Sequence, residues 1–132
     1  MLLVDTNVLA YLLIAGDRTH AAQALYERDP DWRSEAFILV EFSNILATYV
    51  RTRELTLEES LELLGSAQSL MPTLASASHA HALETAANLR ISAYDGRFIS
   101  VAKELGTKLI TEDRRLRAAA PQWTLSIDEA LR

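Results

Sequence analysis

Apolar and polar positions alternate along the chain in a pattern that predicts short buried strands separated by amphipathic helices. Short apolar runs bounded by polar residues predict strands at residues 2–4, 32–34, 71–75, 108–111 and 123–126. Apolar residues at helical spacing predict helices over residues 8–15, 20–28, 36–53, 57–67, 79–90, 95–105, 113–119 and 127–131. Strands that alternate with helices are typical of an α/β fold, in which helices cover both faces of a mainly parallel sheet.

Three local signals place boundaries within this pattern. Thr56 and Glu59 have the spacing of a capping box, which predicts that a helix starts there. Gly106 is expected to end the helix over residues 95–105, because glycine readily adopts the left-handed conformation that closes helices. Pro72 has no amide hydrogen to donate, so the strand at 71–75 is expected either at an edge of the sheet or with this proline at its start.

The composition predicts one domain, residues 1–132, in a soluble cytoplasmic protein. A chain of 132 residues that is 49% hydrophobic can bury a core without metal or disulfide staples. Cysteine is absent, which excludes a disulfide framework, a cysteine nucleophile and thiolate metal sites. We expect neither a signal peptide nor a membrane span, because an acid interrupts the N-terminal apolar run and no apolar stretch is long enough.

Two aspartates fall where the carboxyl ends of strands are expected. Asp5 directly follows the first strand, and Asp113 lies two residues beyond the strand at 108–111. In open α/β sheets the functional crevice lies beyond these strand ends. A structural alternative stays open for Asp5, Asp95 and Asp113, because each precedes a predicted helix and aspartate is a common N-terminal cap.

Glu41 differs from these aspartates because it lies in the middle of a predicted helix. Its neighbours from Phe37 to Leu46 are mostly apolar, and an ionised carboxylate there is costly unless it is paired or binds a metal. The alternatives are a salt bridge to an arginine, or a narrow polar stripe with Asn44 and Thr48.

A parallel sheet can bring all four acids to one edge, where they would repel one another without protons or cations. Magnesium and manganese prefer oxygen ligands and retain several waters. Such a site suits hydrolysis of a phosphodiester, in which one metal activates water and a second stabilises the leaving oxygen. The formal net charge of −5 argues against a protein that coats nucleic acid, but two bound divalent cations would bring it to about −1.

Several polar and basic residues are candidates to support this chemistry. Asn7 and Thr111 would orient a carboxylate or a water, with a local cap or turn as the alternative. Arg114, Arg115 and Arg117 would contact phosphates, with a solvated basic helix face as the alternative. Weaker candidates for the same rim are Arg18, Arg97 and Lys103.

The four acids lie in four segments, residues 3–9, 41–46, 92–98 and 109–116, which are spread over essentially the whole chain. In their order and spacing these segments resemble the PIN-domain family, specifically the VapC-like toxins of toxin–antitoxin pairs. The resemblance implies a three-layer α/β/α domain, a Mg²⁺ or Mn²⁺ site and endonucleolytic cleavage of RNA. It implies that the acidic metal-site and catalytic residues are Asp5, Glu41, Asp95 and Asp113, with support from Asn7 and Thr111.

The resemblance also implies a homodimer and inhibition by a small antitoxin protein that occupies the site. The family usually has alanine after the third acid, where this chain has Gly96. Glycine weakens the start of a helix slightly but leaves the space free.

Two rival functions compete with the nuclease. A haloacid-dehalogenase-type phosphatase also begins with a strand-end aspartate, but it needs a second aspartate two residues later, where this chain has Asn7. A catalytically silent PIN-like interaction module is the non-enzymatic alternative. The four acids argue against it, because a scaffold has no need of them.

Overall fold

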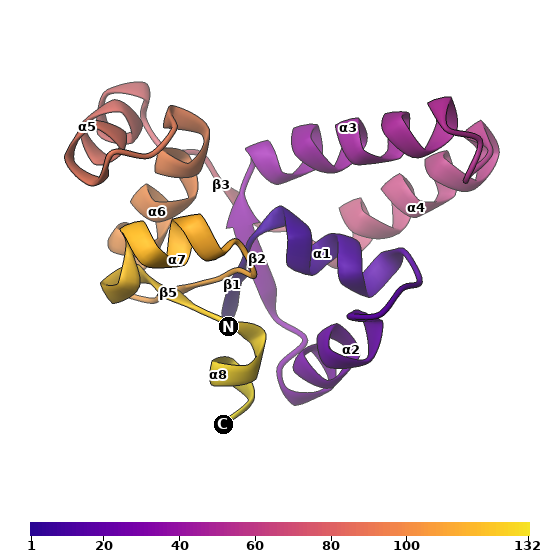
Figure 1. Ribbon diagram of the computed structural model, residues 1–132, viewed down its shortest axis with the longest axis horizontal. Coiled ribbons are helices and arrows are strands. Elements are labelled where there is room, and N and C mark those ends of the chain that lie inside the picture. The colour runs from indigo at the N-terminus through magenta and orange to yellow at the C-terminus, as the bar shows by residue number, and fades with distance from the viewer.

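The computed structural model describes residues 1–132 as five short strands and eight α-helices in alternation (Figure 1). The strands are β1 (Leu2–Val4), β2 (Trp32–Glu35), β3 (Leu74–Ala75), β4 (Leu109–Ile110) and β5 (Thr124–Leu125). The helices are α1 (Thr6–Leu13), α2 (Thr19–Arg28), α3 (Phe37–Arg51), α4 (Leu57–Leu70), α5 (His79–Leu89), α6 (Ala93–Leu105), α7 (Arg114–Ala119) and α8 (Ile127–Leu131). A single 3-10 turn, η1 (Pro121–Trp123), precedes β5.

The strands form one sheet in the order β3-β2-β1-β4-β5, and every neighbouring pair is parallel. β3 lies at an edge, as the proline before it predicted, and it is only two residues long. The order of the strands reverses between β1 and β4. This is the switch point at which open α/β sheets place their ligands.

Helices cover both faces of the sheet (Figure 1). In that view α5, α6 and α7 lie to the left of the strands, while α1, α2, α3 and α4 lie to the right. The central strands are apolar on both faces, because Leu3, Val4, Leu109 and Ile110 are all buried in the main core cluster. The three-layer α/β/α architecture expected from the sequence is therefore confirmed.

Several predicted boundaries are wrong by a few residues, for identifiable reasons. α1 begins at Thr6 rather than at residue 8, because Asp5 caps it. α4 continues to Leu70 rather than 67, since no helix breaker occurs before Pro72. α6 begins at Ala93 rather than at residue 95, because the hydroxyl of Ser92 provides the cap.

α5 and α6 pack unusually closely at Gly96. A Cβ atom placed on this glycine would lie 2.6 Å from the carbonyl oxygen of Ala82 and 3.2 Å from Cβ of Ala86. The position is therefore restricted to glycine by the neighbouring helix backbone. The alanine that the family resemblance led us to regard as usual would not fit here without movement of α5 or α6.

The longest helix, α3, has 15 residues. None of the helices combines the length and the hydropathy that crossing a membrane requires.

Candidate active site

A cavity of about 600 Å³ opens at the carboxyl ends of β1 and β4, and all four predicted acids line it. Asp5 and Asp113 follow these two adjacent strands. Glu41 comes from α3 and Asp95 from α6, which lie on opposite sides of the sheet (Figure 1). The fold thus brings together four carboxyl groups that are distant in the sequence.

Asp5 is the most buried of the four acids, with 7% of the residue exposed. Its Oδ1 accepts the backbone amide hydrogen of Thr6 at 2.8 Å, and its Oδ2 accepts the hydroxyl hydrogen of Thr111 at 2.7 Å. The pKa of Asp5 is raised to about 6, mainly by burial and to a smaller extent by the charges of Glu41 and Asp95, whereas the two hydrogen bonds lower it. Asp5 therefore caps α1 and also presents a poorly solvated carboxylate to the cavity.

Glu41 is half-buried and points into the same cavity. Its Oε1 accepts the hydroxyl hydrogen of Thr6 at 2.6 Å, and no arginine or lysine pairs with it. The salt-bridge alternative considered for this residue is therefore wrong. Burial raises the pKa of Glu41, as do the nearby charges of Asp95 and Glu35, whereas the bond from Thr6 lowers it.

Asp95 does not cap its helix, although the sequence left that alternative open. It occupies the first turn of α6, where its backbone amide donates to the hydroxyl of Ser92 at 3.0 Å. Burial raises the pKa of Asp95, as does the charge of Asp113, whereas hydrogen bonding with the Ser92 side chain lowers it. Asp95 lines the cavity without acting as the cap of its helix.

Asp113 has both roles that the sequence allowed. Its Oδ1 accepts the backbone amide hydrogens of Arg115 at 2.9 Å and Leu116 at 3.1 Å, which caps α7. Its other oxygen, Oδ2, has no hydrogen-bond partner in the protein, and the residue lies on the cavity wall. Capping thus fixes the side chain while leaving one oxygen for a ligand.

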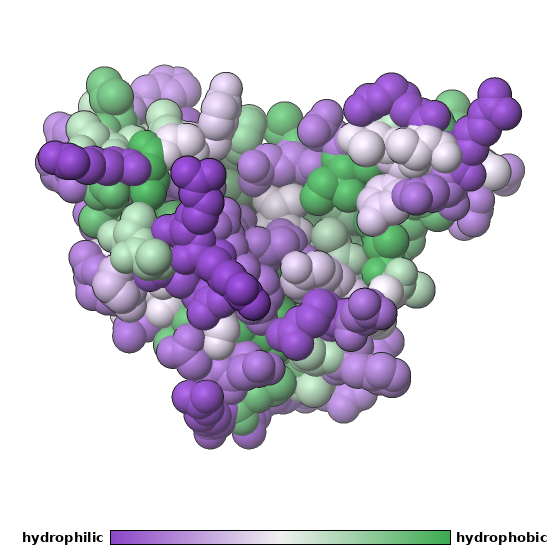
Figure 2. Space-filling model, in the orientation of Figure 1, coloured by the Kyte–Doolittle hydropathy of each residue, from purple (hydrophilic) through white to green (hydrophobic).

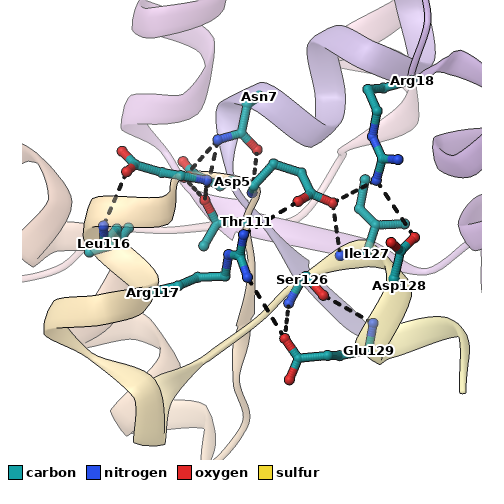
Figure 3. Close-up of polar contacts among 12 residues, drawn as sticks. Asp5, Asn7, Arg18, Thr111, Leu116, Arg117, Ser126, Ile127, Asp128 and Glu129 are labelled. Atoms are coloured by element: carbon teal, nitrogen blue, oxygen red, sulfur yellow. Dashed lines mark hydrogen bonds and ion pairs between the residues drawn. The ribbon is translucent and has the colours of Figure 1, made fainter.

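Asn7 and Thr111 form a polar bridge between the ends of β1 and β4 (Figure 3). The Asn7 amide Nδ2 donates to Thr111 Oγ1 at 3.2 Å and lies 3.4 Å from Asp5 Oδ2. Its Oδ1 accepts the backbone amide hydrogen of Glu112 at 3.2 Å. Both residues therefore hold Asp5 in place, and their supporting role in catalysis stays a prediction.

The side chain of Glu112, the residue after Thr111, belongs to a separate ion-pair network. Figure 3 labels its partners Arg18, Arg117 and Ile127. Oε1 of Glu112 lies 2.8 Å from Nη2 of Arg18 and accepts the backbone amide hydrogen of Ile127 at 3.1 Å. Arg117 lies 3.9 Å from the other carboxylate oxygen. These contacts fasten α8 to the sheet, and they leave Arg18 and Arg117 engaged by acids rather than free at the cavity rim.

Arg97 is likewise engaged inside the fold. It pairs with Glu35, which is fully buried at the end of β2, and its Nη2 donates to the carbonyl of Ala77 at 3.3 Å. Glu35 Oε1 also accepts the backbone amide hydrogen of Phe37 at 2.8 Å. Neither Arg18 nor Arg97 lines the main cavity, and both are engaged by acids, so their place on an RNA-facing rim stays a prediction.

Sequence reasoning missed two residues at or near this site. Thr6 was not among the predicted supporting residues, yet it donates from its backbone amide to Asp5 and from its hydroxyl to Glu41. Glu35 was not singled out, although it ends a strand and the rule that points to strand-end acids applies to it. The partner of Glu35 lies 62 positions away on α6, and no local pattern indicates that pairing.

Arg114 and Arg115 are exposed and make no ion pair with an acid of the chain. Arg115 lines a smaller pocket beside the main cavity, which Asp95 and Asp113 also line. Figure 2 shows strongly hydrophilic side chains gathered over α7 on this face. The placement is compatible with contact to phosphates, and that role stays a prediction.

The residues of the cavity suit a divalent cation in their donor chemistry. All four acids supply oxygen ligands, none is neutralised by a basic side chain, and three have a raised pKa. As the side chains stand, no three acids or histidines cluster closely enough to form a ligand set. The carboxylates repel one another and are held by Thr6, Thr111 and backbone amides, so a cation would have to draw them together.

Comparison with known proteins agrees with this geometry. A family model described as the PIN domain matches residues 2–121, which is most of the chain. The chain belongs to the PIN-domain family. The resemblance drawn from the sequence motifs is thus confirmed, and a haloacid-dehalogenase-type phosphatase is set aside.

A protein similar in sequence to this PIN domain and a solved structure similar in fold both come from Pyrobaculum aerophilum. Ribonuclease VapC3 is 25% identical over 124 residues, which cover 91% of this chain and 95% of that protein. The crystal structure of PAE2754 matches with a TM-score of 0.79 at 19% identity, and the match covers 98% of this chain and 92% of that chain. The structural match shows that the two chains share a fold.

Proposed function

We propose that this PIN domain, acting as one unit over residues 1–132, is a Mg²⁺- or Mn²⁺-dependent endoribonuclease. The observation that carries the proposal is the cavity in which Asp5, Glu41, Asp95 and Asp113 meet without a basic partner. Carboxylates without a basic partner are costly to bury, so the presence of four of them in one cavity is best explained by a cation that binds among them. The similarity to Ribonuclease VapC3 supports RNA as the substrate.

The roles of the acids follow from their surroundings. Asp5, Glu41 and Asp95 would hold one cation directly or through water, and Asp113 would hold a second ion or position the attacking water. When bound, the cations would polarise a water and the leaving oxygen of the phosphodiester. Thr6 and Thr111 keep Asp5 and Glu41 oriented, and Arg114 and Arg115 would hold the flanking phosphates.

We also propose that the chain is the toxin of a toxin–antitoxin pair, that it forms a homodimer, and that a small antitoxin protein occupies the cavity. The name of the relative supports the toxin role. The unpaired carboxylates of the cavity would attract a basic side chain from such an inhibitor, since a buried carboxylate gains most from an opposite charge.

Cleavage of defined RNAs in the presence of Mg²⁺, Mn²⁺ or EDTA tests the proposal. We expect cleavage with either metal and none with EDTA. Asp5→Asn should lower the rate by roughly 100-fold or more, whereas Asp17→Asn, an exposed aspartate without hydrogen bonds or ion pairs, should cleave as the native chain does. Cleavage that persists in Asp5→Asn or in EDTA would refute the assignment.

Manganese titration separates an enzyme from a silent interaction module. The native chain should bind Mn²⁺ more tightly than a variant in which all four acids are replaced by their amides. Equal binding by the two proteins would favour the interaction module.

A further inference from the structure

Two aromatic rings lie at the mouth of the acidic cavity. Phe37 and Tyr94 both line it, with ring centroids 5.3 Å apart and planes inclined by only 9°. Their contact is therefore a parallel stack rather than an edge-to-face pair. Tyr94 is 62% exposed even though its ring rests on Phe37.

The stacked pair is fixed relative to two of the acids. Phe37 begins α3, and Glu41 lies four residues later on the same face of that helix. Tyr94 immediately precedes Asp95 at the start of α6. A group that rests on the rings is therefore held within a few side-chain lengths of the carboxylates.

Nothing in the protein itself uses the outer part of the Tyr94 ring. Phe37 covers one face of the ring, so the opposite face contributes to the large exposed area. The Tyr94 hydroxyl makes no hydrogen bond within the chain, and its neighbour on the cavity wall, Val40, is 57% exposed. Core packing therefore does not account for an aromatic stack beside four acids, because both ring and aliphatic surface stay open to solvent.

We propose, on the basis of the nuclease function above, that Tyr94 backed by Phe37 stacks on an unpaired nucleobase next to the phosphate that is cut. The four acids mark the position of the phosphate, and a base on the neighbouring nucleotide lies within reach of the ring. Proteins that bind single strands use aromatic side chains in this way, because every base has a π face. This contact therefore requires that the nucleotide on the Tyr94 ring is unpaired.

A base-paired RNA does not fit this arrangement. In a duplex both faces of each base are covered by its neighbours, so the Tyr94 ring has no surface on which to stack. Stacking is also tolerant of base identity, so this contact positions the strand and selects unpaired nucleotides more than it selects a sequence.

Fluorescence of 2-aminopurine tests the contact separately from cleavage. The probe is placed at successive positions of a short unstructured RNA, which is bound by the Asp5→Asn variant so that the RNA stays intact. We expect quenching at one position, lost when Tyr94→Ala is added and kept with Tyr94→Phe, which retains the ring. Uniform fluorescence at every position, or quenching that survives Tyr94→Ala, would overturn the proposal.

A thermodynamic cycle links the contact to activity. In the otherwise native chain Tyr94→Ala should lower cleavage of single-stranded RNA by about 5- to 150-fold, the range for loss of one stacked base, with the larger part in KM. Leu83→Ala, an equally exposed apolar residue outside the cavity, serves as the matched control. An RNA that lacks the base at the quenched position should be cleaved equally by the native chain and by Tyr94→Ala.

The outcomes distinguish this proposal from the nuclease function on which it rests. Failure of the native chain to cleave any RNA would refute the nuclease, while the 2-aminopurine result would still report on stacking. If Tyr94→Ala left RNA binding and cleavage unchanged but abolished binding of an inhibitor protein, the rings would be a protein-docking surface and the stacking proposal would be wrong. The Mn²⁺ affinity of Tyr94→Ala should equal that of the native chain, which would show that the substitution leaves Asp95 in place.

Discussion

The hydroxyl of Thr111 donates a hydrogen bond of 2.7 Å to Oδ2 of Asp5. The two residues are 106 positions apart in the sequence and follow adjacent parallel strands. This contact links the ends of β1 and β4 at the place where the order of the strands reverses, beside the hydrogen bonds that Asn7 makes there. It also lowers the pKa of a carboxyl group whose burial raises it.

Replacing Thr111 tests that contact. Thr111→Val keeps the side-chain shape but removes the donor, so the pKa of Asp5 should rise above about 6 and the pH at which cleavage is half-maximal should rise with it. A hydrogen bond to a charged group contributes roughly 1.5–3 kcal/mol, so the half-maximal point should move by on the order of one pH unit. Thr111→Ser, which retains the hydroxyl, should keep the native pH profile. Identical profiles for all three proteins would contradict the role given to Thr111.

Asp5→Asn should stabilise the metal-free protein at neutral pH. The folded pKa of about 6 exceeds the ordinary value of 3.8, so the folded state binds the proton more tightly and loses stability as the pH rises through about 6. The gap between these two pKa values corresponds to roughly 3 kcal/mol. The difference in free energy of unfolding between Asp5→Asn and the native chain should therefore grow by about that amount from pH 4 to pH 8. Urea denaturation in EDTA measures it, and a difference independent of pH would contradict the raised pKa.

Gly96→Ala should destabilise the protein, although alanine is the better helix former. Overpacking against the carbonyl of Ala82 should cost about 1–3 kcal/mol, which exceeds or offsets the gain in helix propensity of about 1 kcal/mol. Asp95 precedes this glycine, so a shift of α6 should also lower the rate of cleavage. Gly65→Ala is the matched control, because nothing lies within 4 Å of a Cβ atom there and α4 should gain about 1 kcal/mol. In thermal and urea denaturation, Gly96→Ala should be less stable than the native chain and Gly65→Ala more stable.

Removing Arg97 alone should lower the free energy of unfolding more than removing the charges of both Arg97 and Glu35. Arg97→Met leaves the fully buried carboxylate of Glu35 without its partner, which should cost about 3–5 kcal/mol. Adding Glu35→Gln to Arg97→Met removes the charge and should restore part of that loss. A double variant less stable than Arg97→Met alone in urea denaturation would show that the pair is not what holds these elements together.

Much of this fold could be predicted from the sequence because its elements are separated by clear local signals. Buried strands such as Leu2–Val4 are short apolar runs, and acids directly after them fall at one edge of a parallel sheet. The convergence of Glu41 with the strand-end acids could be expected, because a carboxylate in the middle of an apolar helix is costly unless it binds a partner or a metal.

The features that could not be predicted from the sequence are contacts between elements, which depend on how the helices pack on the sheet and on one another. The pairing of Glu35 with Arg97 joins the end of β2 to α6, and the whole of α3, α4, β3 and α5 lies between them in the sequence. The need for glycine at position 96 arises from the backbone of α5, not from α6 itself. Arg18 and Arg97 were candidates for a phosphate-binding rim, but the sequence does not show that Glu112 and Glu35 lie close enough to pair with them.

The parallel order of the strands delays the assembly of the site during synthesis. The first acid, Asp5, leaves β1, but β4 beside it and Asp113 beyond it come only when most of the chain has been made. A nascent chain that still lacks this strand has neither the Thr111 anchor nor the fourth carboxylate. The four-acid cavity can therefore form only after the chain has been made beyond residue 113, so a shorter nascent chain lacks the complete set of candidate ligands.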